Sequence, residues 1–391
     1  MASKSKRVFY TVAAVVIGIG IVYGLSIAGD QSQGPIENAL TQVQNTVAKV
    51  EEAVILEQKT VTRAEKLSWL QPYFSSAEKI KHPTHFFFGA YDNNAGKDFQ
   101  PVVNLEDTLH TTFPFIHIYT AWGSKSEHEF PKQQVSDILT LGSIPVITWE
   151  PWLVAFDVTA HPELKAEDAR DKGGMQDVAN GVYDFYLKQW ARQAKKIQAP
   201  ILLRLGHEMN DPYRYPWGPQ NNTAADFVAA WKHVHDVFRK AGANNIIWMW
   251  SPHPAYGFFK EYYPGDAYVD YVGIGTLNYG PIAAWAKWWS FDDIFGKYYK
   301  DLASFKKPII LTEFASLTYG GNRSKWYADA LKNIPEKYPS VRGLLFFHFD
   351  TDNTTTQQVL DWSIINDRKI VSVIRKEVGI WDTSVVKGWS R

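Results

Sequence analysis

The feature that most constrains the fold of this chain is a series of eight short apolar runs between residues 85 and 349. Each run has the length of a β-strand, and helical or loop-rich stretches separate the runs. The runs are His85–Tyr91, Phe115–Thr120, Ile144–Trp149, Pro200–Leu205, Asn245–Trp250, Val269–Thr276, Pro308–Thr312 and Gly343–Phe349. Strands that alternate with helices indicate βαβ units, and therefore a parallel sheet.

Eight units of this kind predict an α/β fold in which the sheet closes into a (β/α)8 TIM barrel, which typically needs roughly 250 residues. The alternative is an open, doubly wound sheet. That fold usually has a glycine-rich turn after its first strand, but the first strand here ends in Tyr91-Asp92-Asn93-Asn94. The sequence therefore favours the barrel.

Two of the intervening stretches have clear helical patterns. Between Asp177 and Ala199, apolar residues recur at helical spacing. Thr223 is the predicted N-cap of a second helix, because Asp226 follows three residues later and Gly242 comes after the last turn. Both helices are expected to lie between strands of the barrel.

The composition limits the classes of function. The 391 residues have a formal net charge of zero, whereas a nucleic-acid-binding domain usually has a basic surplus. The chain has no cysteine, which excludes disulfides, thiol nucleophiles and cysteine metal sites. Its 16 Trp, 20 Tyr and 22 Phe suit a cleft that binds sugars, because flat aromatic rings match the apolar C–H faces of sugar rings.

The N-terminal residues have the pattern of a membrane anchor. Lys4, Lys6 and Arg7 precede an uncharged stretch, Val8–Ala28, that is long enough to span a membrane. The positive charges predict an N-terminus in the cytoplasm and a remainder outside the membrane. The alternative is a signal peptide that is cut after Ser26-Ile27-Ala28, which would release a secreted protein.

The next segment has a different pattern. Between Ile36 and Leu56, apolar residues lie mostly three or four apart, which predicts an amphipathic helix or a stalk. We therefore divide the chain into residues 1–29 as cytoplasmic tip and anchor or signal peptide, 30–80 as helical stem or linker, and 81–391 as the barrel domain. The anchor makes the membrane a predicted partner.

In a barrel of this type, the residues that do chemistry lie at the C-terminal ends of the strands. That rule selects a set rich in carboxylates, His and Trp: Tyr91, Asp92, Trp122, Glu150, Trp152, His207, Glu208, His253, Asn278, Tyr279, Glu313, His348 and Asp350. The set has no cluster with the spacing of a zinc or two-metal site. We therefore expect neither a metal nor a cofactor.

Two of these residues, Glu208 and Glu313, each end an apolar strand abruptly. Carboxylates at these positions are expected to face each other in the mouth of the barrel. Such a pair suits glycoside cleavage, in which one carboxyl protonates the leaving oxygen and the other attacks the anomeric carbon. A separation of about 5–5.5 Å would give retention of configuration through a covalent intermediate.

Other side chains are predicted to bind the substrate. Arg204 can hold a carboxylate in its ionised form, and His207 can hydrogen-bond a substrate hydroxyl or a glutamate. Trp149 and Trp152 flank a strand end and are expected to form a stacking platform. Trp285, Trp288 and Trp289 have helical spacing, which favours packing on the barrel over a lid that covers the cleft.

The run Arg204-Leu205-Gly206-His207-Glu208-Met209-Asn210, followed by Tyr215-Pro216-Trp217-Gly218, resembles the fourth-strand motif of glycoside hydrolase family 26. Members of that family include β-mannanases and mixed-linkage β-glucanases. Asn245–Pro252 resembles the family's fifth strand, and Thr312-Glu313-Phe314-Ala315 its seventh. The resemblance covers roughly residues 85–365.

The resemblance implies that Glu208 is the acid/base of a retaining mechanism and Glu313 the nucleophile. It also implies that His207 and Trp217 contact the substrate near the cleavage point, and that Tyr279 hydrogen-bonds the nucleophile. The chain departs from the mannanase-like pattern after Asn210 and again after Gly273, in the region that binds the sugar.

The sequence therefore predicts an exported hydrolase of a β-linked polysaccharide. Its substrate is a mannan or a β-1,3/1,4-glucan, or an exopolysaccharide made by the cell, since an anchored hydrolase can trim a polymer as it leaves. That last case would associate the protein with a polysaccharide synthesis or export system. The alternative is a non-catalytic carbohydrate-binding envelope protein on the same barrel.

Overall fold

The computed structural model describes residues 62–93, 99–283, 286–354 and 358–384. Eight parallel strands form a closed barrel in chain order, and β8 pairs with β1. The strands are β1 Phe87–Asp92, β2 Phe115–Ala121, β3 Ile144–Glu150, β4 Ile201–Leu205, β5 Ile246–Trp250, β6 Tyr271–Asn278, β7 Ile309–Ser316 and β8 Val341–His348. The predicted barrel is therefore confirmed, and every predicted strand overlaps an observed one.

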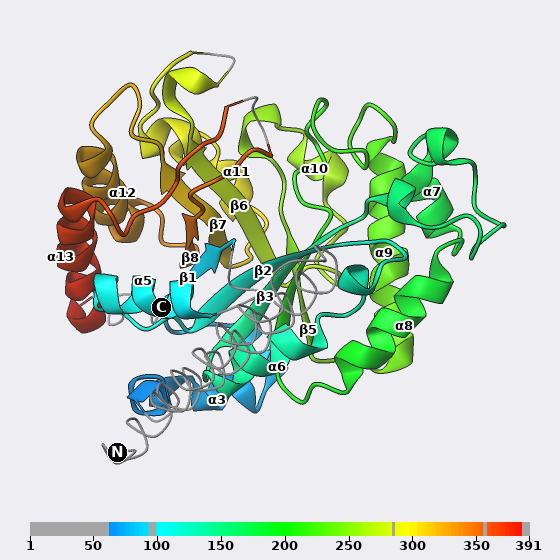
Figure 1. The fold of residues 1–391 in the computed structure, drawn as a ribbon, viewed down its shortest axis with the longest axis horizontal. Helices are drawn as coiled ribbons and strands as arrows, with labels where there is room; N and C mark the ends of the chain where they lie inside the picture. The colour runs from blue at the N-terminus through cyan, green and yellow to red at the C-terminus, as the bar shows by residue number, and fades with distance from the viewer. Residues whose placement is uncertain (1–61, 94–98, 284–285, 355–357, 385–391) are drawn as a thin grey trace, which may run out of the picture. The chain divides into compact units, whose positions relative to one another are not determined.

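Helices surround the strands (Figure 1). They are α3 Gln71–Phe74, α4 Ala77–Lys81, α5 Gln100–Leu109, α6 Lys132–Thr140, α7 Gly174–Ala179, α8 Asp184–Lys195, α9 Ala224–Ala241, α10 Phe259–Tyr262, α11 Tyr299–Ala303, α12 Arg323–Lys337 and α13 Arg368–Ser384. Short 3-10 turns are found at Ser68–Leu70, Ser126–His128, Leu153–Ala155, Glu167–Ala169, Pro254–Tyr256 and Gly280–Ile282, and a π-helical turn at Asp292–Gly296.

The two predicted helices have different outcomes. Helix α9 begins and ends as the sequence indicates, because Thr223 and Asp226 form a capping box and Gly242 adopts φ 81° at the C-cap. The helix predicted over Asp177–Ala199 is wrong as a single element. Gly181 has φ 83°, a left-handed conformation that separates α7 from α8.

The floor of the barrel is closed by the chain that precedes β1. Leu67, Leu70, Tyr73 and Ile80 are buried against inward-facing residues of the barrel strands. These residues share one apolar cluster with residues of the barrel strands, so the end of the segment predicted as stem or linker packs on the barrel. The sequence could not reveal this packing, because apolar residues have the same spacing in an amphipathic stem and in a segment that closes a barrel.

Arg63 fastens this segment to the barrel. Its guanidinium is buried, forms an ion pair with buried Glu106, and donates to the carbonyl of Leu141 at 2.7 Å. It also donates to the hydroxyl of Ser143. Glu106 in turn accepts the backbone N–H of Phe113 at 2.7 Å. Arg63 therefore connects the segment before β1 to α5 and to the loop before β3.

Replacing Arg63 with alanine should lower the free energy of unfolding by about 3–5 kcal/mol, because Glu106 would remain buried without its cation. Urea unfolding followed by circular dichroism measures this quantity. Lys66→Ala is the matched control, since Lys66 is exposed and its loss should change stability by no more than about 0.5 kcal/mol. If Arg63→Ala lowered the free energy of unfolding by less than about 1 kcal/mol, the proposed stabilising role of Arg63 would be contradicted.

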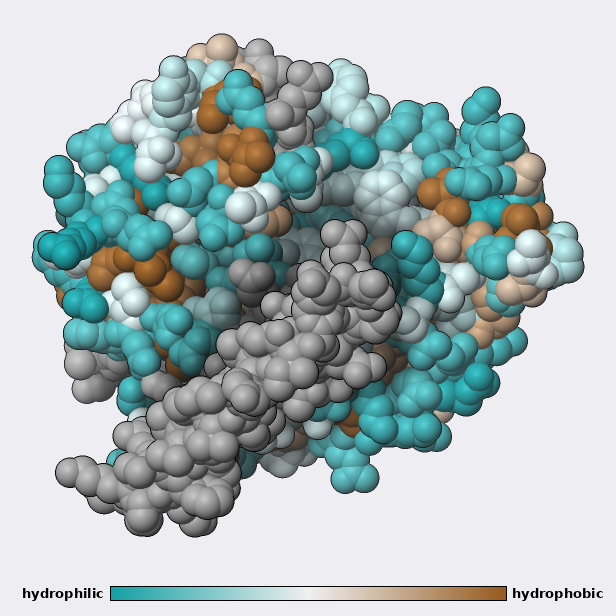
Figure 2. Space-filling view, viewed as in Figure 1, coloured by the Kyte–Doolittle hydropathy of each residue, from teal (hydrophilic) through white to brown (hydrophobic). Residues whose placement is uncertain are grey.

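In the part of the chain that the structure describes, no helix has the length and apolar character needed to cross a membrane. The predicted anchor, Val8–Ala28, and the predicted amphipathic segment up to Leu56 lie outside those residues. The face shown in Figure 2 is largely hydrophilic, and its apolar patches are separate from one another.

Candidate active site

Glu208 is presented by a tight turn after β4. Gly206 has φ 47° and Glu208 has φ 54°, and a left-handed conformation is uncommon for a residue such as glutamate. The N–H of Glu208 donates to the carbonyl of Ser251 at 2.6 Å, which ties the turn to the end of β5. Strain of this kind is found where a structure holds a functional side chain in place.

Asn210 strengthens this turn. Its amide donates to the carbonyls of His253 and Gly257, at 2.9 and 2.8 Å, and its Oδ1 accepts the N–H of His253 at 2.7 Å. Asn210 is buried, so these bonds are shielded from water. The turn after β4 and the loop after β5 therefore behave as one rigid support for Glu208.

Glu313 is placed by an irregularity in β7. Between β6 and β7, Ile274 pairs with Leu311 but Gly275 pairs with Glu313, so Thr312 is left out of the register. The pairing of β7 with β8 is also irregular between Leu311 and Phe314. Bulges re-aim side chains beside active sites, and this one accompanies the turn of the Glu313 carboxylate into the mouth of the barrel.

The two carboxylates face one point. A Cβ built on Gly275 would lie 3.2 Å from Oε2 of Glu313 and 3.4 Å from Oε1 of Glu208. The separation of these oxygens is therefore no greater than the sum of the two lengths. Glu208 and Glu313 are brought together as predicted, at a separation compatible with the ~5–5.5 Å of retaining glycosidases.

The environment of Glu313 favours its ionised form. Burial by itself raises the pKa of this carboxyl, but the positive charge of Arg204 and the surrounding hydrogen bonds outweigh burial and hold the pKa well below its usual range. Nη1 of Arg204 lies 2.5 Å from Oε1, and the hydroxyl of Tyr119 donates to the same oxygen at 2.7 Å. The other oxygen of Glu313, Oε2, faces Glu208 and the position that a side chain at residue 275 would occupy.

The environment of Glu208 favours its protonated form. Burial raises the pKa of this carboxyl to about 7, and the negative charge of Glu313 also raises it. Arg214 has the opposite effect, but its Nη1 lies 3.7 Å from Oε2 and makes no hydrogen bond to it. Below about pH 7 the two buried carboxyls are thus in opposite protonation states, as an acid and a nucleophile require.

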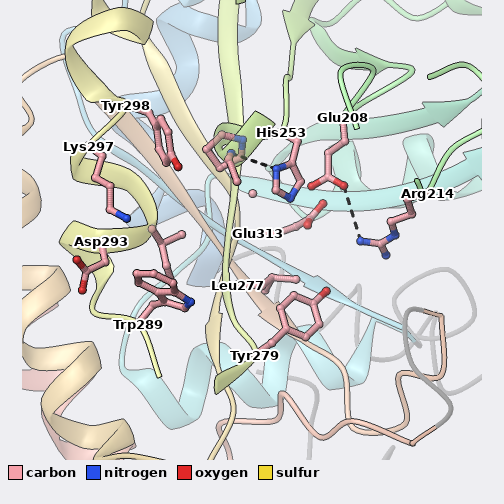
Figure 3. Close-up of a pocket in the computed structure, with 14 residues that line it drawn as sticks. Glu208, Arg214, His253, Leu277, Tyr279, Trp289, Asp293, Lys297, Tyr298 and Glu313 are labelled. Atoms are coloured by element: carbon pink, nitrogen blue, oxygen red, sulfur yellow. Dashed lines mark hydrogen bonds and ion pairs between the residues drawn. The ribbon is translucent and has the colours of Figure 1, made fainter. Parts of the chain in front are cut away.

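A cleft extends to both sides of the pair. One cavity, of about 240 Å³, lies on the side of Glu208, His253, Trp289 and Lys297 (Figure 3). A second cavity of about 300 Å³ lies on the side of the β1, β2, β3 and β8 ends. Both are lined by Arg214, Leu277, Tyr279 and Glu313, so the carboxylates stand near the middle of one elongated cleft.

Three of the predicted substrate contacts line this cleft. His207 and Trp152 lie in the second cavity, and Tyr279 lines both. Nε2 of His207 is 2.9 Å from the hydroxyl of Tyr215, while its Nδ1 has no hydrogen-bond partner. Burial and the nearby cation Arg204 hold the pKa of His207 well below its usual value. His207 is therefore neutral, and its buried Nδ1 lies 4.0 Å from Oε1 of Glu150.

Trp149 and Trp217 do not fit the predicted role. Trp149 is 0% exposed and stacks on Trp190 with ring centroids 4.3 Å apart, so it belongs to the core outside the barrel. Trp217 is 1% exposed and donates its Nε1–H to the carbonyl of His207 at 2.8 Å. Trp217 therefore supports a residue of the cleft from behind and has no surface for a sugar.

Arg204 is also absent from the surface of the cleft. It is fully buried, and its contacts are Glu313, Ser251 and Thr148. Its side chain therefore acts on the nucleophile, as the ionising role predicted, and has no direct access to a substrate.

Several residues of the cleft were missed by the sequence analysis. Tyr119 lies within β2, and the sequence analysis considered only the residues at strand ends. The alternation of side chains along the strand places Tyr119 inside the barrel. Arg214 and Lys297 lie in loops without a recognisable pattern. The helix expected around Trp289 is wrong, because residues 286–290 are not helical. Trp288 packs on the core as expected, whereas Trp289 lines the cleft.

Among the described residues, one group has the composition of a metal site. Ligand atoms of Glu208, Asp211 and His253 all lie within 4.8 Å of one another. The group includes the buried carboxyl that faces Glu313, and its nearest cation is Arg214. One member of the group, Glu208, already belongs to the carboxyl pair, and we assign no ion to the group.

Comparisons with known proteins agree with this geometry. The model of glycosyl hydrolase family 26 matches residues 157–372, which is more than half of the chain. Endoglucanase H of Acetivibrio thermocellus is 32% identical over 273 residues, 68% of this chain and 27% of that protein. A mannan endo-1,4-beta-mannosidase of Bacillus subtilis is 28% identical over 150 residues, 36% of this chain and 37% of that protein.

A solved structure gives the same fold. GH26C from Muricauda sp. superimposes with a TM-score of 0.57 at 16% identity, covering 78% of this chain and 88% of that one. The chain spans between about a quarter and two-fifths of the length of the curated relatives named above. The family match, the barrel and the two facing glutamates lead to one conclusion: this chain belongs to glycosyl hydrolase family 26.

Proposed function

We propose that this protein is a retaining endo-β-glycanase in which Glu208 is the acid/base and Glu313 the nucleophile. The observation that carries the proposal is the opposite electrostatic setting of the two facing carboxyls. Burial raises the pKa of Glu208 to about 7, whereas Arg204 and Tyr119 keep the pKa of Glu313 low. A binding protein has no need of that difference, which argues against a non-catalytic role.

The geometry supports a specific first step. Oε1 of Glu313 is held by Arg204 and Tyr119, so Oε2 is the oxygen that attacks the anomeric carbon. Glu208 transfers its proton to the glycosidic oxygen as the bond from that oxygen to the anomeric carbon breaks. The products are a glycosyl ester of Glu313 and a released chain end with a new hydroxyl.

The second step returns both groups to their starting states. Formation of the ester removes the negative charge of Glu313, which had raised the pKa of Glu208. Glu208 therefore becomes a base that takes a proton from water, and the resulting hydroxide attacks the anomeric carbon. Glu313 leaves as a carboxylate, and two inversions give net retention.

We propose a β-1,4-mannan or a β-1,3/1,4-glucan as the backbone of the substrate. The support is the names of the relatives, which are an endoglucanase, a mannan endo-1,4-beta-mannosidase and a beta-1,3-xylanase. An open cleft on both sides of the carboxyls supports cleavage within a chain. An exopolysaccharide made by the same cell is compatible with this backbone.

The test is to incubate the full chain with mannan, glucomannan, lichenan, laminarin, xylan and cellulose, and to follow reducing ends. The expected result is hydrolysis of at least one mannan or mixed-linkage glucan with a rapid fall in viscosity. Proton NMR of the first product should show the β-anomer. An α-anomer as first product would contradict the double displacement.

We also propose that the barrel acts outside the cytoplasm, tethered through Val8–Ala28, with secretion after cleavage as the alternative. The support is the charge pattern around this apolar stretch. Protease added to intact cells should remove the barrel from a tethered protein. Complete protection in intact cells, with digestion after lysis, would refute this location.

A further inference from the structure

The Glu208 side of the cleft has a group of positive charges that the catalytic pair does not use. Trp289 lines this cavity, and two lysines pack on its indole ring. The Nζ atoms of Lys287 and Lys297 lie 4.1 and 4.5 Å from the ring centroid. Lys297 itself lines the cavity, and Figure 3 shows it on the same side of the pocket as Asp293 and Trp289.

Neither ammonium is neutralised by a carboxylate at contact distance. In the described parts of the chain, Lys287 and Lys297 form no ion pair and no hydrogen bond, and their recorded contact is with Trp289. The nearest acidic group is Asp293, whose carboxylate accepts the hydroxyl and the N–H of Ser290 at 2.6 and 3.2 Å. Asp293 also lines the cavity, and its hydrogen bonds to Ser290, with the charges of Lys297 and Lys287, hold its pKa below the usual value.

The segment that carries Lys297 is firmly anchored. Phe291, directly before the π-helical turn, and Phe295, within it, are buried in the core. Ile294 in the turn, and Lys297 and Tyr298 directly after it, line the cavity. π-Helical turns are uncommon and are found frequently at functional sites. The position of Lys297 is therefore set by buried anchors, although its own side chain is exposed.

The two halves of the cleft differ in charge. The half beside Tyr119 is lined by Glu150 and Asp352 and has no lysine among its described residues. The half beside Glu208 has Lys297 and one further carboxylate, Asp293, in its wall, and Lys287 lies on the same indole as Lys297. A neutral glycan gains little from such a difference, whereas a glycan that carries negative charge gains from binding in one direction only.

We propose that Lys287 and Lys297 form a subsite for a carboxylate, and that the substrate is therefore an acidic β-glycan. The carboxylate belongs to the sugar that binds beside Trp289, near the bond that is cleaved. This inference rests on the proposed function for the identity of the ligand as a β-glycan. The carboxylate can be a uronic acid group or a carboxyl attached through a substituent.

The test compares three preparations of one glucomannan oligosaccharide: unmodified, oxidised to the carboxylate at C6, and carboxymethylated. Calorimetry measures the Kd of each for the full chain carrying Glu208→Gln, which slows turnover enough for binding to be measured. The expected result is at least about fivefold tighter binding of one acidic form over the neutral form, the size of an exposed ion pair. The tighter of the two acidic forms identifies the source of the carboxylate. The preference should shrink as salt rises.

Lys297→Met and Lys287→Met, each in the same background, should reduce this preference, measured as the ratio of the Kd of the neutral form to the Kd of the acidic form. Lys297→Arg should preserve it. Lys300→Met is the matched control, because it removes one charge from an exposed lysine that lies outside the cavity. Equal Kd values for all three preparations, no measurable binding, or a preference that survives both lysine variants would overturn the proposal. Failure of the wild-type chain to hydrolyse any preparation, with the preference intact, would instead count against the proposed function.

Discussion

Replacing Glu313 with alanine should abolish hydrolysis of the polysaccharide that the wild-type chain cleaves, with a loss in kcat of at least about 10⁴-fold. The proposed glycosyl ester cannot form without this carboxylate. Reducing-end assays at high protein concentration measure the residual rate. Azide should restore part of the activity by occupying the vacated space and attacking the anomeric carbon directly, and the product should then be a glycosyl azide of inverted configuration.

Stability must be separated from chemistry in this variant. Arg204 is fully buried, and without Glu313 its charge loses its counterion, which costs about 3–5 kcal/mol. Glu313→Gln is the better matched variant, because the amide keeps the volume and still accepts from Tyr119. Both variants should lose activity, and both should be checked by thermal unfolding. A folded Glu313→Gln protein with more than one-tenth of the wild-type rate would exclude Glu313 as the nucleophile.

Replacing Glu208 with glutamine should reduce hydrolysis of polysaccharide by about 10²–10⁴-fold, the usual contribution of a general acid. An aryl glycoside with a good leaving group needs no proton, so its first step should slow much less. The wild-type rate should fall as pH rises through about 7, because Glu208 must be protonated and burial raises its pKa to that value. No loss is expected on the acid side until pH approaches the low pKa of Glu313.

The pH profile provides the control for Glu208. In Glu208→Gln the decline near pH 7 should disappear from the residual hydrolysis of polysaccharide, since no proton remains to be lost. His253 lies beside Glu208, but burial holds its pKa at about 4, so it cannot produce a decline near neutrality. Persistence of the decline in Glu208→Gln would assign it to another group and remove Glu208 as the acid.

The periodicity of the sequence was sufficient for the barrel and for the placement of Glu208 and Glu313 at its mouth. Strand length and spacing are properties of the local chain, and the C-terminal ends of parallel strands must meet at one edge. The motif around Glu208 also includes the residues that hold it, since Gly206 and Asn210 are part of the same turn.

The remaining features depend on contacts between distant residues. The hydrogen bond from Tyr119 to Glu313 spans 194 positions of the chain, and the bulge at Thr312 depends on how β7 pairs with both neighbours. Trp149 is a residue that the sequence analysis assigned to the cleft and that the structure places elsewhere. It ends its strand as a cleft residue would, but its ring points outward into the helices. A shift of one residue decides between these two directions.

The absence of a side chain at residue 275 has an evolutionary consequence. A methyl group there would occupy the space between the two carboxylates, at 3.2 and 3.4 Å from their oxygens, where the reacting carbon has to fit. Every glycine codon becomes an alanine codon by one nucleotide change. A lineage of such enzymes therefore stands one mutation away from a lectin, a protein that keeps the barrel and the outer cleft but can no longer cut what it holds.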